Sequence, residues 1–537
     1  MKPIADSPLP FAIPTQTQPR MLVLHPTRLF TPLLLALTHL IWLTTLSAAL
    51  SAEYGVRWKL IEDEAADYDL PCERLGAAAG LAAKDFDSIF PWSKIHLCKL
   101  VTRPDGSQKV CYAGDPEFVS DKTQGNVMVE IPKHYTRRVV NDGHESRWIS
   151  AECLPGYDVD PAFVEAGREI EHVYVGAYEA CITADGRMES VSGVHPTPDK
   201  TRVQYREHAR ANGPGFGTMD LRTLLLLQNL YLIEHADRNS QRALGNGWGK
   251  MLQPHQTHRC VRPERSVNRI ITKPAKPTTV KRIEEGVFVG GAIQITSYEK
   301  SGAVHVAGRT LTAIKLDDPE PGFVSLYFDG DPVDTTTDMC LGGSAQKTGW
   351  ADAIPAHSGH GEFHGSPPYD SYRCAVKYRH MENLWGNLWC YIDGVNLANG
   401  RAYICDDMTA YASGMTSGAY HPVALNQLLQ DDNGDIGGVR EVHYMKNLGY
   451  DPKEPWLALP LDFTYQGLSS SPGKSMPLRN GHFGDYYYLN TKATCYVHGG
   501  GFDHYWRCGL FTLRGWATDT QKWYLYGSRL IYKPVKK

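Results

Sequence analysis

The closing segment of this chain, residues 499–530, combines glycines with a dense run of aromatic and charged side chains. It opens with three glycines at 499–501 and contains the run DHYWR at 503–507. Charged groups in this number cannot all be buried without partners, so the segment cannot be a simple apolar core. Tyr, Trp and Arg offer a large contact area at low entropic cost and dominate recognition hot spots. The pattern therefore predicts a binding surface, although single aromatic residues within it could still fill a small β core.

The composition places the chain among globular proteins and excludes several functional classes. A length of 537 residues predicts two or more domains, and 50 Gly, 34 Pro and 29 Tyr favour a loop-rich architecture that contains β-sheet. A net charge of -4 without a Lys/Arg stripe gives no reason to expect a nucleic-acid partner. The 12 cysteines are scattered singly, which argues against a zinc knuckle or a disulfide miniprotein. Reduced thiols and a few long-range disulfides both remain open.

The first 52 residues form a hydrophobic leader that we expect to lie outside the fold. Residues 29–50 are almost entirely apolar and follow Arg20 and Arg28. Three interpretations remain open: a signal peptide that starts at Met21, an N-terminal membrane anchor, or an extension that is not part of the working protein. Pro32 and His39 weaken the anchor interpretation.

Local signals divide the remainder of the chain into units. A Pro-Asp-Gly turn at 104–106 between strand-like runs predicts a hairpin. Thr201 and Gln204 form a capping box for a helix that ends at Gly213, and Asp220 can cap a second, leucine-rich helix. Residues 262–282, rich in Lys, Arg, Pro and Thr, are typical of a linker. We therefore predict a β-rich unit at 53–120, two halves of one domain at 121–262 and 346–537, and a compact β insertion at 283–345.

Three segments, in this order, resemble formylglycine-generating-enzyme-like proteins. They are YVGAYE at 174–179, ENLWGNLW at 382–389, and the closing element from Gly500 to Leu530. The resemblance implies an α+β fold of the C-type-lectin type: a loop-rich domain with small twisted sheets and two helices. A closer resemblance is to phage tail and bacterial surface proteins whose last segment is diversified by retroelements and forms a variable ligand-binding face. The opening YGVRW at 54–58 and the ending GSRL at 527–530 are similar to this branch.

In that branch, the closing segment divides into scaffold and ligand contacts. The resemblance implies scaffold roles for Gly500, Gly501, Gly509, Leu510, Phe511, Gly527, Ser528, Arg529 and Leu530. It implies ligand contacts at Asp503, His504, Tyr505, Trp506, Thr512, Arg514, Trp516, Asp519, Lys522 and Tyr524. The chain departs from the branch by carrying few Asn and Ser and many bulky aromatics there, so whether this face is diversified remains open.

The enzymatic alternative within the same resemblance is an oxidase that binds copper through a closely spaced cysteine pair. Cys495 and Cys508 are thirteen residues apart, and the short-spaced pair is missing. We therefore expect no catalysis and no cofactor, with Cys508 a small buried side chain.

Other candidate sites have simpler interpretations. Three histidines and a glutamate at 357–364 could bind a metal ion, but the Gly-rich context favours a flexible loop. Residues 431–437 resemble a calcium loop with the glycine one position late, which favours an Asx-Gly turn. We predict no metal site. Polar residues at 382–396 could bind a sugar or calcium, or could satisfy buried backbone groups: Glu382, Asn383, Asn387, Asp393 and Asn396.

These patterns predict a non-catalytic recognition protein, with adhesion at a phage tail as the leading context. The expected partners are a host or cell-surface protein or glycan and other virion tail proteins, at a virion tail or a cell surface. Assembly into a homo-oligomer such as a trimer would strengthen weak single sites through avidity. A secreted or anchored bacterial lectin is the further alternative.

Overall fold

The computed structural model describes residues 52–60, 72–121, 125–244, 259–273, 292–297, 304–346, 376–425, 435–436, 439–440, 442–466, 483, 486–501 and 508–534. All of them belong to one compact unit, residues 51–537. The leader, the histidine-rich segment at 357–364 and most of the acidic loop at 431–437 lie outside the described residues.

Two sheets are built mainly from the first part of the described chain. The first has the order β2-β1-β7-β6-β8. Its strands are β1 (Glu53–Lys59), β2 (Glu73–Gly76), β6 (Tyr135–Asn141), β7 (His144–Ser150) and β8 (Asp158–Val159). The second has the order β14-β34-β11-β5-β3-β4. Its strands are β3 (His96–Thr102), β4 (Gln108–Tyr112), β5 (Asn126–Pro132), β11 (His172–Gly176), β14 (Phe216–Thr218) and β34 (Leu530–Tyr532).

The second sheet joins the two ends of the described chain. Every residue of β5 is buried, as expected for a central strand that is covered on both faces. The C-terminal strand β34 pairs with β11 and β14. The predicted hairpin is confirmed, since β3 and β4 are antiparallel partners and the Asp105 carboxylate accepts hydrogen bonds from Ser107 in the turn. Residues far apart in the sequence thus share one sheet.

Both predicted helices are present with their predicted caps. Helix α2 (Arg202–Arg210) begins after the reciprocal capping box of Thr201 and Gln204. Helix α3 (Leu221–His235) begins after Asp220, whose carboxylate accepts a hydrogen bond from the Thr223 amide. Thirteen of the fifteen α3 residues are buried, which explains its lack of an amphipathic pattern. A short third helix, α4 (Ser240–Leu244), was not predicted.

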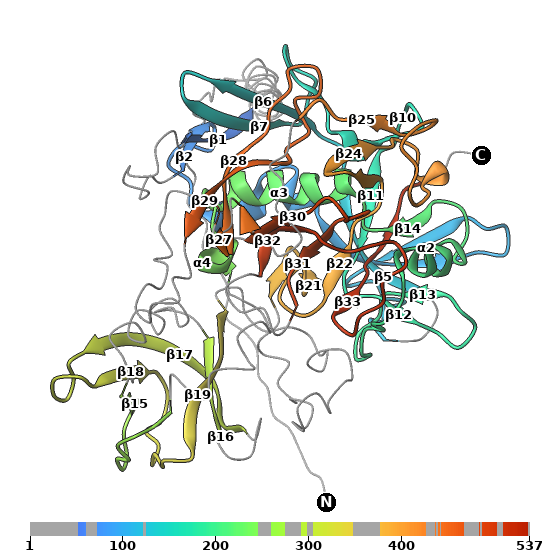
Figure 1. Ribbon diagram of the computed structural model, residues 1–537. Helices are drawn as coiled ribbons and strands as arrows, with labels where there is room; N and C mark the ends of the chain where they lie inside the picture. The colour runs from blue at the N-terminus through green and yellow to red at the C-terminus, as the bar shows by residue number, and fades with distance from the viewer. Residues whose placement is uncertain are drawn as a thin grey trace, which may run out of the picture. The chain divides into compact units, whose positions relative to one another are not determined.

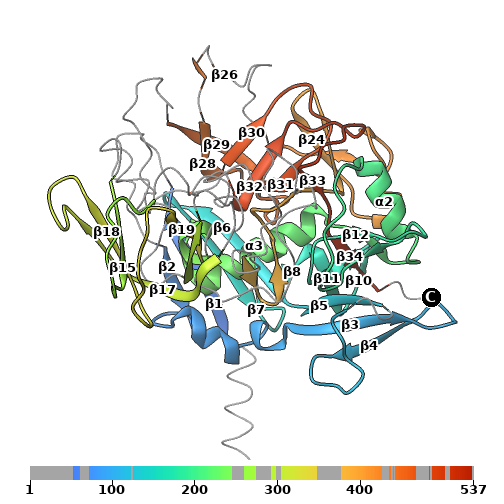
Figure 2. The same cartoon turned by 90° about the horizontal axis from the view of Figure 1, so that it is seen from below.

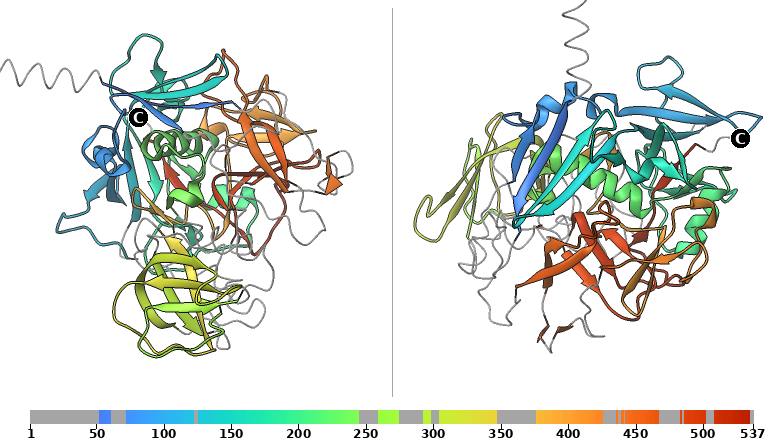
Figure 3. Two further views of the ribbon diagram at one scale, coloured as in Figure 1. Left: turned by 90° about the vertical axis from the view of Figure 1, so that its left-hand side faces the viewer. Right: turned by 90° about the horizontal axis from the view of Figure 1, so that it is seen from above.

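Helix α3 forms the centre of the main core. Figures 2 and 3 show it between the sheet of β1 and β7 and the red strands of the C-terminal half. On one side, the Trp92 indole donates to the Leu230 carbonyl at 3.3 Å. On the other, the Gln228 side chain donates to the Leu510 carbonyl at 3.0 Å, and the Leu510 amide donates to Ser240 of α4. The helix therefore supports the C-terminal segment.

The C-terminal half contributes a seven-stranded sheet in the order β29-β28-β30-β32-β31-β22-β33. Its strands are β22 (Trp389–Tyr391), β28 (Val442–Leu448), β29 (Pro460–Gln466), β30 (Tyr486–Leu489), β31 (Val497–Gly499), β32 (Gly509–Gly515) and β33 (Tyr526–Gly527). A three-stranded sheet consists of β23 (Val395–Ala398), β24 (Arg401–Ile404) and β25 (His421–Pro422). Figure 1 shows β22, β30, β31 and β32 grouped beside α3.

The remaining elements of the main core are short. Paired two-residue strands are β9 (Val164–Glu165) with β10 (Arg168–Glu169), β12 (Cys181–Ile182) with β13 (Met188–Glu189), β20 (Lys377–Tyr378) with β21 (Met381–Glu382), and β26 (Asp435–Ile436) with β27 (Val439–Arg440). The 3-10 helices are η1 (Ala83–Ser88), η2 (Trp92–Lys94), η3 (Pro161–Phe163) and η8 (Met408–Ala410).

The β insertion begins earlier than predicted. Its sheet has the order β15-β18-β17-β16-β19 and its own hydrophobic core. Its strands are β15 (Arg269–Thr272), β16 (Ala292–Ser297), β17 (Val304–Leu316), β18 (Val324–Phe328) and β19 (Met339–Gln346). Strand β15 lies within the segment predicted as a linker, and that prediction is wrong for these residues. Ile270 and Ile271 are buried against β18, and this packing outweighs the polar composition around them.

The described chain is therefore an α+β protein, rich in small sheets. No helix within the described ranges is long and apolar enough to cross a membrane.

Candidate functional site

Strand β32 carries two of the predicted ligand contacts on one face, Thr512 and Arg514, and a third, Trp516, lies directly after the last residue of the strand. Thr512 and Arg514 are two residues apart, and alternate residues of an extended strand point to the same side. Thr512 is fully buried, Arg514 is half-buried, and Trp516 is 36% exposed. Trp516 and Arg514 are therefore accessible at the surface, whereas Thr512 is not.

The guanidinium of Arg514 lies among three aromatic rings. Its carbon is 4.9 Å from the ring centroid of Trp516, 5.6 Å from that of Trp389 and 5.8 Å from that of Tyr488. The Trp516 and Tyr488 rings are 5.0 Å apart and tilted. A cation over aromatic faces is attracted by the ring quadrupoles, so these rings hold the guanidinium in place. We call Arg514, Trp516, Tyr488 and Trp389 the arginine–aromatic cluster.

The cluster leaves hydrogen-bonding capacity on Arg514 unused. Within the described ranges, its guanidinium makes no hydrogen bond or ion pair, and its Nε is buried without an acceptor. A guanidinium presents five donors in a planar fork that suits carboxylates and other paired acceptors. The cluster can therefore combine stacking on Trp516 with hydrogen bonds from Arg514.

The glycines before β32 allow the close contacts that support it. Gly500 has a φ of +83°, and a Cβ there would lie 2.7 Å from the Cys508 sulfur. At Gly499, with a φ of +91°, a Cβ would lie 2.9 Å from the Leu384 carbonyl oxygen. Any larger residue would clash and would be strained at this φ.

Arg529 connects the end of the chain to the segment at 382–389 through hydrogen bonds. Its buried guanidinium donates to the Gly176 carbonyl at 2.7 Å, and also to the carbonyls of Glu382 and Asn383. All of the residues expected to be scaffold, from Gly500 to Leu530, are buried. The surface around Trp516 is thus held by a rigid base.

The other predicted contacts lie in different settings. Asp503, His504, Tyr505 and Trp506 are outside the described residues. Lys522 is exposed and Tyr524 is half-buried beside Trp523, with ring centroids 5.5 Å apart. Asp519 pairs with the buried guanidinium of Arg202 at 2.6 Å. This ion pair gives Asp519 a structural partner that the sequence pattern did not reveal.

The polar residues at 382–396 are buried, and their side chains bind other buried polar groups. Asn383 and Asn387 donate to the carboxylate of Glu179. Asp393 forms a two-point ion pair with Arg206 at 2.7 and 2.8 Å. Asn396 accepts from Arg202. These contacts agree with the interpretation that such side chains satisfy buried groups, although the partners are mainly charged side chains rather than backbone.

Glu179 provides a pH-dependent prediction. Burial raises its pKa from an ordinary value of 4.5 to about 7, in spite of Arg529 and the two asparagine donors. A raised carboxyl pKa stabilises the fold fully below the ordinary value, and this stabilisation is lost as pH rises towards 7. This rise in the pKa of Glu179 corresponds to a change of roughly 3 kcal/mol in the free energy of unfolding. Compared with the wild-type chain, Glu179→Gln should make the slope of urea midpoint against pH more positive between about pH 4.5 and 7, and an unchanged slope would contradict the prediction. Asp160, whose pKa is also raised to about 7, retains its own part of that slope. Burial lowers the pKa values of His134, His235 and His498, and these groups contribute a slope of the opposite sign in both proteins.

The cysteines and possible metal ligands in the described part of the chain do not form a further candidate site. Cys508 is fully buried, as predicted, and its sulfur donates to the Gly501 carbonyl at 3.3 Å. Burial raises the pKa of Cys495 to about 12, which keeps that thiol protonated. No group of three or more His, Cys, Asp or Glu in the described part of the chain is placed to hold a metal ion.

Sequence reasoning missed Tyr488 and Trp389 as members of the cluster. Tyr488 lies directly beside Arg514 through the pairing of β30 with β32. Trp389 reaches the cluster from β22, which pairs with β31 and β33. Only the strand order of the sheet brings these aromatics to Arg514, and no local motif signals it.

The fold and this surface define an α+β protein with an arginine–aromatic cluster that reaches the surface at Trp516. No known family model matches the chain, and no curated protein matches it.

Proposed function

We propose that this chain is a non-catalytic recognition protein whose C-terminal face binds a host-surface or cell-surface protein or glycan. The single observation that carries the proposal is the arginine–aromatic cluster. Trp516 is exposed, and Arg514 has unused donors beside it. Among the described residues, only Tyr112 and Trp516 are exposed aromatic side chains. Exposed Trp with Arg on a rigid base is the typical composition of an interaction hot spot.

We further propose that the domain is C-type-lectin-like. Three features support this fold: two capped helices, several small sheets, and the pairing of the C-terminal strand β34 with β11. In this arrangement the sheets and α3 form the base, and the closing segment carries the variable ligand contacts. The resemblance places such a protein at a phage tail tip, and a secreted bacterial lectin would use the same face.

The test is binding of the full chain to intact bacterial cells and to an array of immobilised glycans. We expect Trp516→Ala and Arg514→Ala each to weaken any binding shown by the wild-type chain by roughly 30-fold, because hot-spot truncations cost about 2 kcal/mol or more. Labelled protein bound to cells, titrated by flow cytometry, gives the apparent affinity. The melting temperature should change little.

Met415→Ala is the matched control, since Met415 is an exposed apolar residue outside the closing segment. It should leave binding unchanged. Wild-type binding that survives both cluster substitutions would refute the proposed face. A large fall in melting temperature for Trp516→Ala would show instead that this side chain supports the core.

A further inference from the structure

A second polar surface lies on the sheet formed by β11, β5, β3 and β4, away from the closing segment in sequence. Glu130 on β5 is paired in register with Tyr174 on β11 and with His96 on β3. Residues opposite one another on adjacent strands point to the same face of the sheet. His172 precedes Tyr174 by two residues, and Tyr112 is paired with Cys98, two residues beyond His96. All five side chains therefore share one face.

Glu130 is a buried carboxylate held by two tyrosines. The Tyr174 hydroxyl donates to it at 2.7 Å, and the Tyr112 hydroxyl lies 3.1 Å from both of its oxygens. Burial, followed by the charge of Glu130, raises the pKa of Tyr112 to about 12, so this phenol remains a donor. His172 Nε2 lies 3.8 Å from the carboxylate. A carboxylate has about four acceptor positions, so Glu130 keeps capacity for one further donor.

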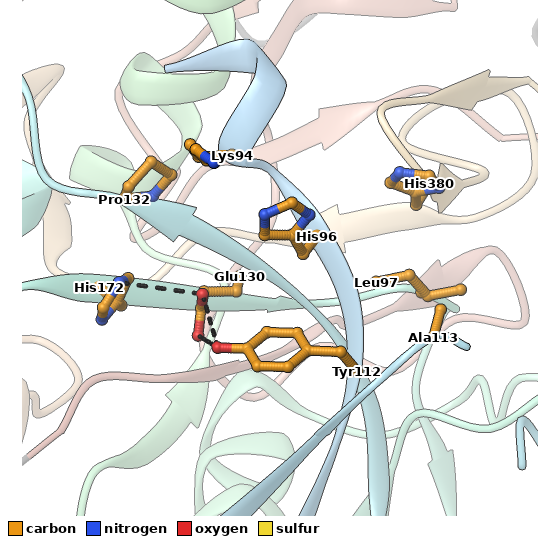
Figure 4. A pocket seen from close by; sticks show the side chains of 9 residues that line it. All are labelled: Lys94, His96, Leu97, Tyr112, Ala113, Glu130, Pro132, His172 and His380. Carbon is orange, nitrogen blue, oxygen red and sulfur yellow. Dashed lines mark hydrogen bonds and ion pairs between the residues drawn. The ribbon is translucent and has the colours of Figure 1, made fainter. Parts of the chain in front are cut away.

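This face forms part of the wall of a cavity of about 730 Å³. Figure 4 shows the His96 imidazole near the middle of the site, with Glu130 and Tyr112 on one side and Lys94 and His380 around it. Neither the Lys94 ammonium nor the His96 ring nitrogens make a hydrogen bond or ion pair with any residue in the described ranges. The cavity therefore contains unused cationic and neutral donors next to a carboxylate. Its size is within the range of small-molecule sites.

The turn that carries His380 is strained and firmly held. Arg379 and His380 connect β20 to β21 and have φ values of +44° and +69°. A two-residue hairpin with both φ values positive is normally built from Asn and Gly. Arg379 is anchored by ion pairs of 2.7 Å to Glu234 and to Asp87. Backbone strain that the surroundings maintain is characteristic of functional sites, and here it brings His380 to the cavity.

The chemistry of the lining favours an anion that also carries hydroxyl groups. The lining has more hydrogen-bonding nitrogen groups than acidic ones, since Lys94 and three imidazoles surround the single carboxylate of Glu130, which the tyrosines already satisfy in part. The described residues include no donor set arranged for a metal ion. The Tyr112 side chain is 38% exposed and offers a flat ring face for apolar contact. A carboxylate would meet Lys94 and His96, a hydroxyl would donate to Glu130, and a ring of C–H groups would cover Tyr112.

We propose that this cavity binds a uronic acid unit, a sugar ring that carries a carboxylate. The site is independent of the proposed C-terminal face and would add a second point of contact for an acidic glycan. Two weak sites on one chain raise overall binding strongly when one ligand spans both.

The experiment is calorimetric titration of the full chain with methyl β-D-glucuronide, methyl β-D-glucoside and acetate. We expect saturable binding of the glucuronide, with the glucoside and acetate each at least about tenfold weaker, because each lacks one half of the recognised chemistry. Lys94→Met and His96→Ala should each weaken glucuronide binding by about tenfold. Both side chains are exposed, so these variants should fold.

Lys84→Met is the matched control, because Lys84 is an exposed lysine outside the cavity, and it should bind as the wild-type chain does. Absence of saturable glucuronide binding would overturn the proposal. Acetate binding as tightly as the glucuronide would overturn the sugar assignment, and equal binding of the glucoside would overturn the role of Lys94.

Discussion

Replacing Asp220 by alanine is expected to lower the free energy of unfolding by about 3 kcal/mol, because it leaves the buried ammonium of Lys533 with only the more distant carboxylate of Glu165, 3.6 Å away. The Asp220 carboxylate lies 2.6 Å from the ammonium of Lys533, and both side chains are fully buried. It also caps α3 at Thr223 and accepts from the Tyr411 hydroxyl at 3.0 Å. One side chain thus joins the central helix to the end of the chain.

The pH dependence of this contribution follows from its charge partners. Burial alone would raise the pKa of Asp220, but Lys533 and Arg222 lower it to about 2. A lowered carboxyl pKa means that the stabilisation is present above the ordinary value of 3.8 and is lost as pH falls through about 2. The Asp220→Ala difference in urea midpoint should therefore be constant above about pH 5, which lies roughly one pH unit or more above both pKa values.

Two further variants separate the ion pair from the helix cap. Asp407→Ala removes the exposed cap of a 3-10 helix and should cost about 1 kcal/mol. Asp220→Ala combined with Lys533→Met should recover part of the loss, since it removes a buried charge that has lost its nearer partner. If Asp220→Ala were no more destabilising than Asp407→Ala, the buried pair would not be the main link.

Asp519→Ala is expected to lower the free energy of unfolding by about 3 kcal/mol, although Asp519 lies in the predicted ligand-binding segment. Its carboxylate is 2.6 Å from Arg202, whose side chain is 1% exposed. Arg202 keeps hydrogen bonds to the Val395 and Ile392 carbonyls and the nearby charge of Asp393, but it loses its direct ion pair. The Asp519 amide also donates to Thr494 at 2.9 Å, so the residue is fixed at two points.

Lys522→Ala is the control for Asp519→Ala. Lys522 lies three residues further on and is exposed, so its loss should change stability by no more than about 0.5 kcal/mol. Urea denaturation at constant m-value measures both differences. A stable Asp519→Ala variant with impaired cell binding would assign Asp519 to the ligand instead of to Arg202.

Local sequence predicted the parts of the fold that neighbouring residues decide. The capping box at Thr201, the cap at Asp220 and the turn at 104–106 all occur as predicted, because each depends on contacts only two or three residues apart. The segment at 262–282 failed as a linker because β15 forms through pairing with a strand more than fifty residues away. Composition does not report such pairing.

From the sequence alone, the closing segment was predicted to be a binding surface, and the family resemblance implied a division into scaffold and ligand contacts, with Trp516 and Arg514 among the contacts. Only the tertiary structure decided that Thr512 is buried, that Asp519 serves Arg202, and that Tyr488 and Trp389 surround Arg514. It also brought Lys94, His96, Glu130, His172 and His380 to one cavity. The physical reason is the same for both sites: strand register and long-range packing determine which side chains meet, and neither is encoded in any short stretch of chain.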